Sequence, residues 1–307
     1  SRIFESVAGI GCFQLINHGI PPELIRSAAK AAAKIFRVSP EKKAVASRST
    51  GNPFGFDEIH GGDDEGEVGE EFVWCGDQNF NSEMEGVWPE GYSRLSLKLE
   101  RLSSEMVRIS TRLLTALRED PLGRLPMIGR GVVQAGSEEG HLRRDATTSP
   151  PAVCCVHRYR RKVSPVQWVR SLRYDLMKML IEGVEFSHAL GLHALCDAPP
   201  EFHVYSKKAW VSFRPDPTAL IITAGDQIQA WSGGRLKYVM GRPMCNVDGR
   251  KGSVSMAFLC SPAILAAPTA GRSSRGEDKI ISLGQQLLVA LISVLVYHLL
   301  LYILRRS

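Results

Sequence analysis

The stretch WVSFRPDPTALIITAGDQIQAWSGGR at residues 210–235 decides the fold of the second half of the chain. Its apolar runs are short, and the turn residues Asp216-Pro217 and Gly233-Gly234 separate them. Runs of the same kind lie along this half of the chain, and they read AVCCVH, FHVYS, AWVSF, ALIIT, QIQAW and SVSMAFL. Many short strands at close spacing predict an all-β barrel or sandwich.

The first half of the chain follows a helical period instead. Pro22 begins an Ala-rich helix, and Ser93–Arg118 carries apolar residues at helical spacing, which predicts a long amphipathic helix. Residues 47–71 are rich in glycine and acidic residues and are predicted to form a loop. One further helical pattern, at residues 167–184, predicts a helix inserted among the strands.

These patterns divide the chain into five parts. We predict a helical region (1–118), a loop (119–151), a β-rich core (152–262), a polar linker (263–279) and a hydrophobic end (280–307).

Composition excludes several classes of protein. Apolar residues make up 44% and charged residues 23%, which is ordinary for a folded globular chain. The net charge of +6 is mild, and no nucleic-acid-binding signature surrounds its densest cluster, HRYRRK at 157–162. We therefore predict a solvated basic loop there and no nucleic-acid partner. The seven cysteines form no CxxC pair, which argues against a zinc ribbon and suits a reducing compartment.

The C-terminal run LLVALISVLVYHLLLYIL, Leu287–Leu304, has no formal charge. As a helix it would span about 27 Å, close to the roughly 30 Å core of a bilayer. The run predicts a single-pass membrane anchor with the main domain in the cytosol, at an organelle that the sequence does not specify. A buried terminal helix is the alternative. The chain starts at Ser1 inside an amphipathic pattern, which predicts further residues upstream.

Five stretches together resemble one known family. They are GCFQLINHGIP (11–21), GEEFVW (69–74), HRYR (157–160), the stretch at 210–235, and SMAFLCSP (255–262). In this order they resemble the plant Fe(II)- and 2-oxoglutarate-dependent dioxygenases, especially the gibberellin-oxidase-like branch. The resemblance covers roughly residues 1–262. It implies an α+β fold with a double-stranded β-helix (jelly-roll) core at 152–262 and an N-terminal helical region, to which the hydrophobic C-terminal helix is added.

The chemistry of that family needs two histidines and one carboxylate around iron, and an arginine that binds 2-oxoglutarate. The resemblance places these four groups at Phe186, His188, Gly241 and Ser253. Of the three metal positions, only His188 could ligate a metal ion. A shifted match that makes His188 the first ligand puts Leu190 at the carboxylate position. Tyr159 matches a tyrosine that helps to bind the co-substrate, although it could equally be a core residue.

Two functions follow from this pattern. The first is a non-catalytic, membrane-anchored binding or scaffold protein without a cofactor. Its partners would be a membrane, through residues 287–304, and a small carboxylated ligand; whether it has a protein partner stays unknown from the sequence. The alternative is an active oxidoreductase that hydroxylates a small molecule with Fe(II) and 2-oxoglutarate at an altered metal site. Residues 119–151 and 160–185 fit the family poorly, so an imperfect gene model is a third explanation.

Overall fold

The computed structural model describes residues 2–49, 51–60, 67–119, 150–159, 166, 170, 171, 173, 174, 176, 177, 185–195, 201–206, 209–244 and 254–262. They all belong to one compact unit of the chain, Ser1–Arg130 with Arg144–Ala267. Every structural statement below concerns this part of the chain.

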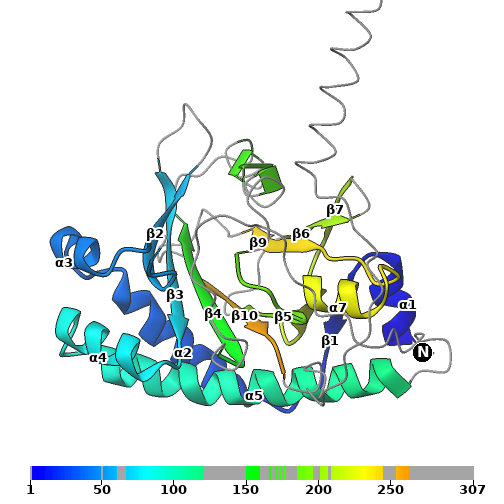
Figure 1. Ribbon diagram of the computed structural model, residues 1–307, viewed down its shortest axis with the longest axis horizontal. Coiled ribbons are helices and arrows are strands. Elements are labelled where there is room, and N and C mark those ends of the chain that lie inside the picture. Colours follow the sequence, from blue (N-terminus) through cyan, green and yellow to red (C-terminus); the bar gives the residue numbers. More distant parts are fainter. Residues whose placement is uncertain are drawn as a thin grey trace, which may run out of the picture. The chain divides into compact units, whose positions relative to one another are not determined.

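Most helices precede the core strands in the chain (Figure 1). They are α1 (Arg2–Gly9), α2 (Pro22–Ile35), α3 (Pro40–Val45), α4 (Gln78–Val87), α5 (Tyr92–Glu119) and α7 (Asp226–Trp231). The predicted long helix is α5, and it buries an apolar stripe at helical spacing that includes Leu95, Leu99, Leu102 and Met106. Asp77 caps α4, because its carboxylate accepts a hydrogen bond from the backbone N–H of Phe80 at 3.0 Å.

The strands form two antiparallel sheets. They are β1 (Cys12–Leu15), β2 (Gly55–His60), β3 (Glu67–Cys75), β4 (Ala152–Tyr159), β5 (Leu190–Leu195), β6 (Glu201–Ser206), β7 (Ala209–Phe213), β8 (Leu220–Ala224), β9 (Met240–Met244) and β10 (Val254–Cys260). The seven-stranded sheet has the order β1-β8-β5-β10-β4-β3-β2, and the three-stranded sheet has the order β7-β6-β9.

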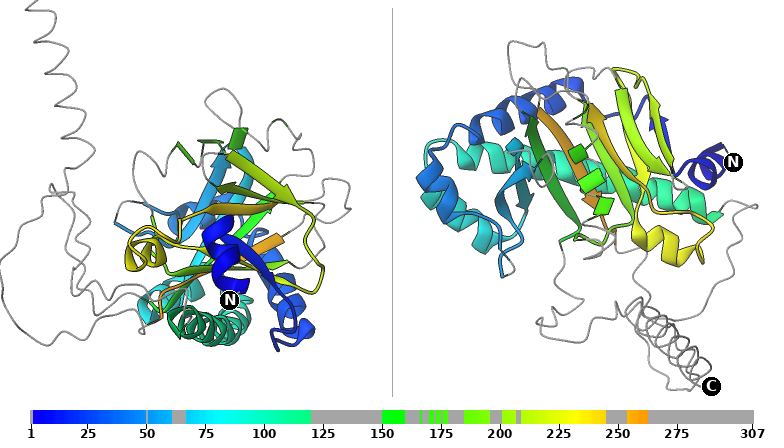
Figure 2. Two further views of the ribbon diagram at one scale, coloured as in Figure 1. Left: turned by 90° about the vertical axis from the view of Figure 1, so that its right-hand side faces the viewer. Right: turned by 90° about the horizontal axis from the view of Figure 1, so that it is seen from above.

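The two faces of the large sheet have different neighbours. On one face, Leu192, Val156 and Phe258 join the core cluster that includes the buried residues of α2 and α5, and Figure 2 shows both helices against this face. On the other face, Ile221 of β8 packs in one cluster with Phe202 and Val204 of β6. The small sheet therefore covers the large one, as the predicted jelly roll requires.

Two predictions about individual elements were wrong. The run QIQAW was expected to be a strand, but it is the short helix α7, in which only Ile228 is buried. Residues 47–71 were expected to be a loop, but they contain β2 and the beginning of β3. These strands form because β3 pairs along its length with both β2 and β4, and the pairing outweighs the local preference of glycine and acidic residues for loops. Of the predicted inserted helix at 167–184, the structure describes residues 170, 171, 173, 174, 176 and 177, and all of them are helical.

The predicted membrane anchor is corrected. No helix in the described part of the chain is long and apolar enough to cross a bilayer. The longest helix there, α5, is amphipathic and charged on one side, so it packs against the sheet instead. The run Leu287–Leu304 lies outside the described residues. A single-pass anchor and a membrane localisation are therefore not supported.

Candidate functional site

A row of paired residues crosses the face of the large sheet that meets the small sheet. From β8 to β3 these residues are Ile221, His193, Ala257, Cys155 and Val73. Directly paired side chains point to the same side of a sheet. His193 also contacts Phe202 of the small sheet, with 5.0 Å between the ring centroids. We call the space between the two sheets the barrel interior.

The turn that carries Phe186 and His188 is held by the beginning of α7. Asp226 accepts hydrogen bonds from the Ser187 hydroxyl at 2.6 Å and from the backbone N–H of His188 at 2.8 Å. The preceding Gly225 has no room for a side chain, because a Cβ there would lie 2.1 Å from the carbonyl oxygen of His188. The Gly-Asp pair of the 210–235 stretch therefore positions this turn.

His188 is buried and bonded to the backbone of its own turn. Its Nδ1 lies 2.7 Å from the carbonyl oxygen of Phe186, and Asp226 Oδ1 is 3.9 Å away from the same nitrogen. Burial lowers the pKa of His188, although the hydrogen bond to Phe186 and the charge of Asp226 oppose this shift. The imidazole is therefore neutral near pH 7, with one ring nitrogen already engaged.

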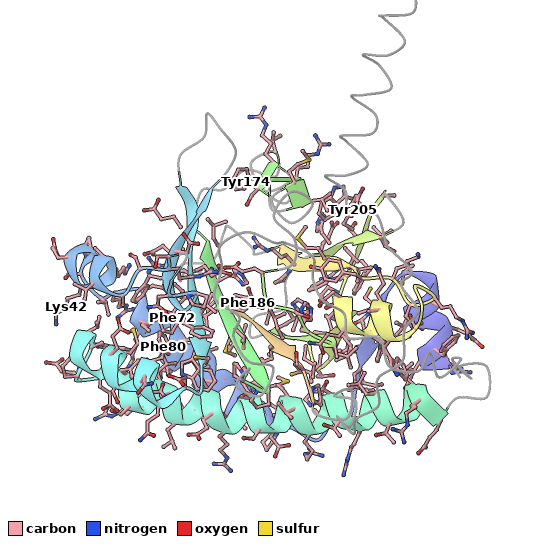
Figure 3. All side chains as sticks on the ribbon, in the orientation of Figure 1. Lys42, Phe72, Phe80, Tyr174, Phe186 and Tyr205 are labelled. Atoms are coloured by element: carbon pink, nitrogen blue, oxygen red, sulfur yellow. The ribbon has the colours of Figure 1, made fainter. Side chains whose placement is uncertain are left out.

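Phe186 contacts another aromatic ring and a cation. Its ring stacks on Phe54 with 6.0 Å between centroids, and the guanidinium of Arg48 lies 5.6 Å from its centre (Phe186 is labelled in Figure 3). A phenyl ring has no lone pair to give to a metal ion. The residue at the predicted first metal position thus makes an aromatic stacking contact and a cation–π contact.

Gly241 lies on β9, directly opposite Val204 of β6. A Cβ at position 241 would be 2.7 Å from Cε1 of Phe202 and 3.3 Å from Cγ2 of Val204. Phe202 is fully buried between His193 and Phe213, so its ring cannot easily move away. This ring fills the space that a side chain at the predicted third metal position would need.

This close packing gives a direct prediction. Gly241→Ala should lower the free energy of unfolding by about 1–3 kcal/mol, because the new methyl group overpacks the barrel interior. Gly86→Ala in α4 is the matched control. Nothing lies within 4 Å of a Cβ at that position, so this variant should be neutral or slightly more stable. Urea unfolding of both variants measures the difference, and equal stability would contradict the filled site.

Arg48, Glu71 and His157 form a buried ionic cluster next to Phe186. Glu71 accepts hydrogen bonds from Arg48 Nη1 and from His157 Nε2, both at 2.7 Å. Arg48 also contacts Asp57 at 3.5 Å and pairs with Glu185 next to Phe186. Burial alone would raise the pKa of Glu71, but the hydrogen bond and charge of His157, with Arg48 and Arg242, lower it to about 2. The carboxylate is thus ionised and fixed.

Ser255 is the neighbour of this cluster on β10, paired directly with His157. Its hydroxyl is buried without a hydrogen-bond partner in the described structure. Of the remaining sequence-predicted residues, Tyr159 ends β4 opposite Gly69, but its side chain is outside the description. Ser253, at the predicted position of the 2-oxoglutarate arginine, is also outside the described residues.

These side chains do not fit an iron ion. Within the described ranges, no three His, Cys, Asp or Glu side chains come together in a way that could hold a metal. His188 offers one free ring nitrogen, Phe186 offers none, and position 241 has no room for a donor. The Ser255 hydroxyl is buried without a hydrogen-bond partner among the described residues, and the charge of Arg242 acts on Tyr238.

Comparison with known families assigns the chain to a superfamily. The family described as "non-haem dioxygenase in morphine synthesis N-terminal" matches residues 1–90. The family described as "2OG-Fe(II) oxygenase superfamily" matches residues 191–262. Together the two matches cover more than half of the chain. The chain belongs to the 2OG-Fe(II) oxygenase superfamily, and its relatives are plant dioxygenases.

The similarity to individual proteins is distant but extends over most of the chain. The 1-aminocyclopropane-1-carboxylate oxidase 5 of Arabidopsis thaliana is 23% identical over 286 residues, which cover 91% of this chain and 83% of the relative. Gibberellin 2-beta-dioxygenase 6 of Oryza sativa subsp. japonica is 27% identical over 272 residues, 86% of this chain and 67% of the relative.

A solved structure supports the fold. The dioxygenase for auxin oxidation 1 from Arabidopsis thaliana, in a 2-oxoglutarate complex, aligns with a TM-score of 0.56. The alignment covers 88% of this chain and 94% of that chain at 18% identity. At this level of sequence identity, the structural similarity confirms the fold alone.

The sequence alone did not point to Arg48, Glu71 or Phe202. Glu71 lies in the GEEFVW stretch, where an acidic residue between apolar strand residues is a weak signal of a buried partner. No signal of this kind exists for Arg48 or Phe202, because their roles depend on neighbours that are distant in sequence.

Proposed function

We propose that this chain is a non-catalytic member of its superfamily and uses the barrel interior to bind a small carboxylated ligand. The observation that carries the proposal is the contact at position 241, where a Cβ would lie 2.7 Å from the buried ring of Phe202. A missing ligand residue alone could be replaced by a neighbouring one. Here the neighbouring space is filled by Phe202, which argues against a rebuilt metal site.

The charges of the described residues favour an anionic ligand. Tyr238 is largely buried; burial and the charge of Asp226 raise its pKa to about 12, while Arg242 acts in the opposite direction. Tyr238 therefore keeps its hydroxyl proton and can donate a hydrogen bond. Ser255 offers a second hydroxyl, and Arg242 supplies a permanent positive charge. Donors and a cation together suit a carboxylate.

A metal titration tests the proposal. Cobalt(II), a redox-inert substitute for iron(II), is titrated into the full chain by calorimetry, with and without 2-oxoglutarate, and succinate formation is measured with iron(II). We expect no metal binding tighter than millimolar and no succinate. The His188→Ala variant should behave as the natural chain does.

The opposite result would favour the alternative function. Micromolar cobalt binding that strengthens with 2-oxoglutarate and disappears in His188→Ala would identify an altered but active metal site. Succinate formed together with a hydroxylated small molecule would then establish an oxidoreductase. Circular dichroism of each sample verifies that a negative result comes from a folded chain.

A further inference from the structure

The helices α2 and α5 have exposed sides that point away from the large sheet. Their buried stripes join the core cluster on one face of that sheet, so their exposed stripes face solvent. Figure 2 shows the two helices side by side, and Lys98 Nζ of α5 donates a hydrogen bond to the carbonyl oxygen of Ser27 in α2 at 3.3 Å. We call the exposed residues of α2 and α5 the outer helix face. It lies across the large sheet from the barrel interior.

The outer helix face carries positive charge that the described part of the chain does not neutralise. Two of its glutamates are already used, because Glu23 pairs with Arg26 and Glu105 pairs with Arg108. Figure 3 shows nitrogen-tipped side chains along the side of α5 away from the sheet. The exposed cations that make no ion pair with any described residue include Lys30, Lys34, Arg94, Arg101 and Arg112. The face therefore attracts an anionic partner.

An apolar residue lies among these charges. Leu97 is 68% exposed. It follows Arg94 by three residues and precedes Arg101 by four, so the three side chains share one side of α5. Spacing by three and then four residues is the seam that one helix presents to another. Arginine is also enriched in protein interfaces, where lysine is depleted. The Arg94–Leu97–Arg101 side of α5 thus has the spacing and the residue types of a helix-binding surface.

The composition of the outer helix face favours a protein over a surface of phosphate groups. Tyr92 is the only aromatic residue in the two helices, and it is buried, so the face offers no ring on which bases could stack. Glu100 is exposed beside Arg101 and makes no ion pair with a described residue, so it would repel phosphates. A protein partner can place a basic or neutral side chain opposite Glu100.

We propose that the outer helix face docks an acidic amphipathic helix of a partner protein. Carboxylates of that helix pair with Arg94 and Arg101, because a guanidinium binds a carboxylate through two parallel hydrogen bonds. Apolar side chains of the same helix cover Leu97. Seven residues of a helix span about 10.5 Å, so two carboxylates one heptad apart match the two arginines. This surface acts independently of the barrel interior, since the large sheet lies between them.

A synthetic acidic peptide tests the proposal. It has three heptads, with leucine and glutamate on the side that would face α5, and repulsion between its glutamates keeps it unfolded when alone at pH 7. We expect it to bind the full chain and to become helical, as circular dichroism measures. Fluorescence anisotropy gives the affinity at physiological salt. Arg94→Glu combined with Arg101→Glu should weaken binding by roughly tenfold or more, and Leu97→Ser by roughly threefold or more.

The matched control is Arg214→Glu combined with Lys237→Glu. It changes the net charge by the same amount at exposed positions outside α2 and α5, and it should leave the affinity nearly unchanged. Equal weakening by the two double variants would show that net charge alone attracts the peptide. That result, an unaffected Leu97→Ser variant, a peptide that stays unfolded, or no binding would each overturn the proposal. Tighter binding of a DNA duplex or of phosphatidylserine vesicles than of the peptide would also overturn it. The cobalt titration judges the non-catalytic proposal separately.

Discussion

A chain that carries F186H, H188D and G241H is expected to bind cobalt(II) no better than the natural chain. Adding F202A to these three substitutions is expected to tighten cobalt binding by roughly a hundredfold. The triple variant has all the donors of a two-histidine, one-carboxylate site. Its third donor cannot take its place, however, because the Cβ of residue 241 meets the ring of Phe202 at 2.7 Å.

The control for this experiment is a variant with a cavity next to Phe202 in which the ring of Phe202 still blocks position 241. Phe213 packs on Phe202 with 5.7 Å between the ring centroids. F213A combined with the three ligand substitutions should weaken packing to a similar degree without improving metal binding. Calorimetry and the visible absorption of bound cobalt report the outcome. Tight binding by the triple variant alone would show that Phe202 does not block the site.

The experiment separates two explanations for the proposed loss of the metal site. If the ligands were simply lost, restoring them would restore the metal. If the barrel interior was also repacked around the missing ligands, metal binding needs both the ligands and the space at position 241. The stacked pair of Phe54 and Phe186, with Arg48 over the ring, points the same way, since a histidine at 186 would lose this packing.

The sequence predicted the strands of the jelly roll well, because alternating apolar residues identify buried strands such as β6, where Phe202 and Val204 point inward. The prediction failed at QIQAW, because five residues are too few to distinguish the periodicity of a helix from that of a strand. Ile228 and Trp231 are three apart and Ile228 and Ala230 two apart, so helix and strand both fit. Gly225 has no room for a side chain, and it is the residue directly before α7.

The site could be predicted only in part, for a different reason. The residues at positions 186, 188 and 241 are visible in the sequence once the resemblance is known. What surrounds them depends on strand register, which pairs Gly241 with Val204 and places Phe202 beside it. Arg48 reaches the site from a loop and is bound by carboxylates of β2, β3 and the turn before β5. No local pattern encodes these distant contacts.

Glu71→Gln is expected to lower the free energy of unfolding by about 3 kcal/mol at pH 7. The folded-state pKa of Glu71 is lowered from 4.5 to about 2. A carboxyl group whose pKa is lowered by folding contributes its full stabilisation at every pH above its unfolded-state pKa. That stabilisation is lost as the pH falls from about 4.5 to about 2. The difference between the variant and the natural chain should thus shrink by more than half at pH 3.

The pH dependence distinguishes the charge of Glu71 from its packing, because glutamine has nearly the same shape. Glu105→Gln is the matched control: Glu105 pairs with Arg108 on the surface of α5, and an exposed pair contributes only roughly 0.5 kcal/mol. Urea unfolding at pH 7, 5 and 3 gives both curves. A Glu71→Gln effect that stays constant over this range would mean that the residue acts by shape alone. A shrinking effect would identify the bonds from Arg48 and His157 as the reason this buried carboxylate is tolerated inside the barrel.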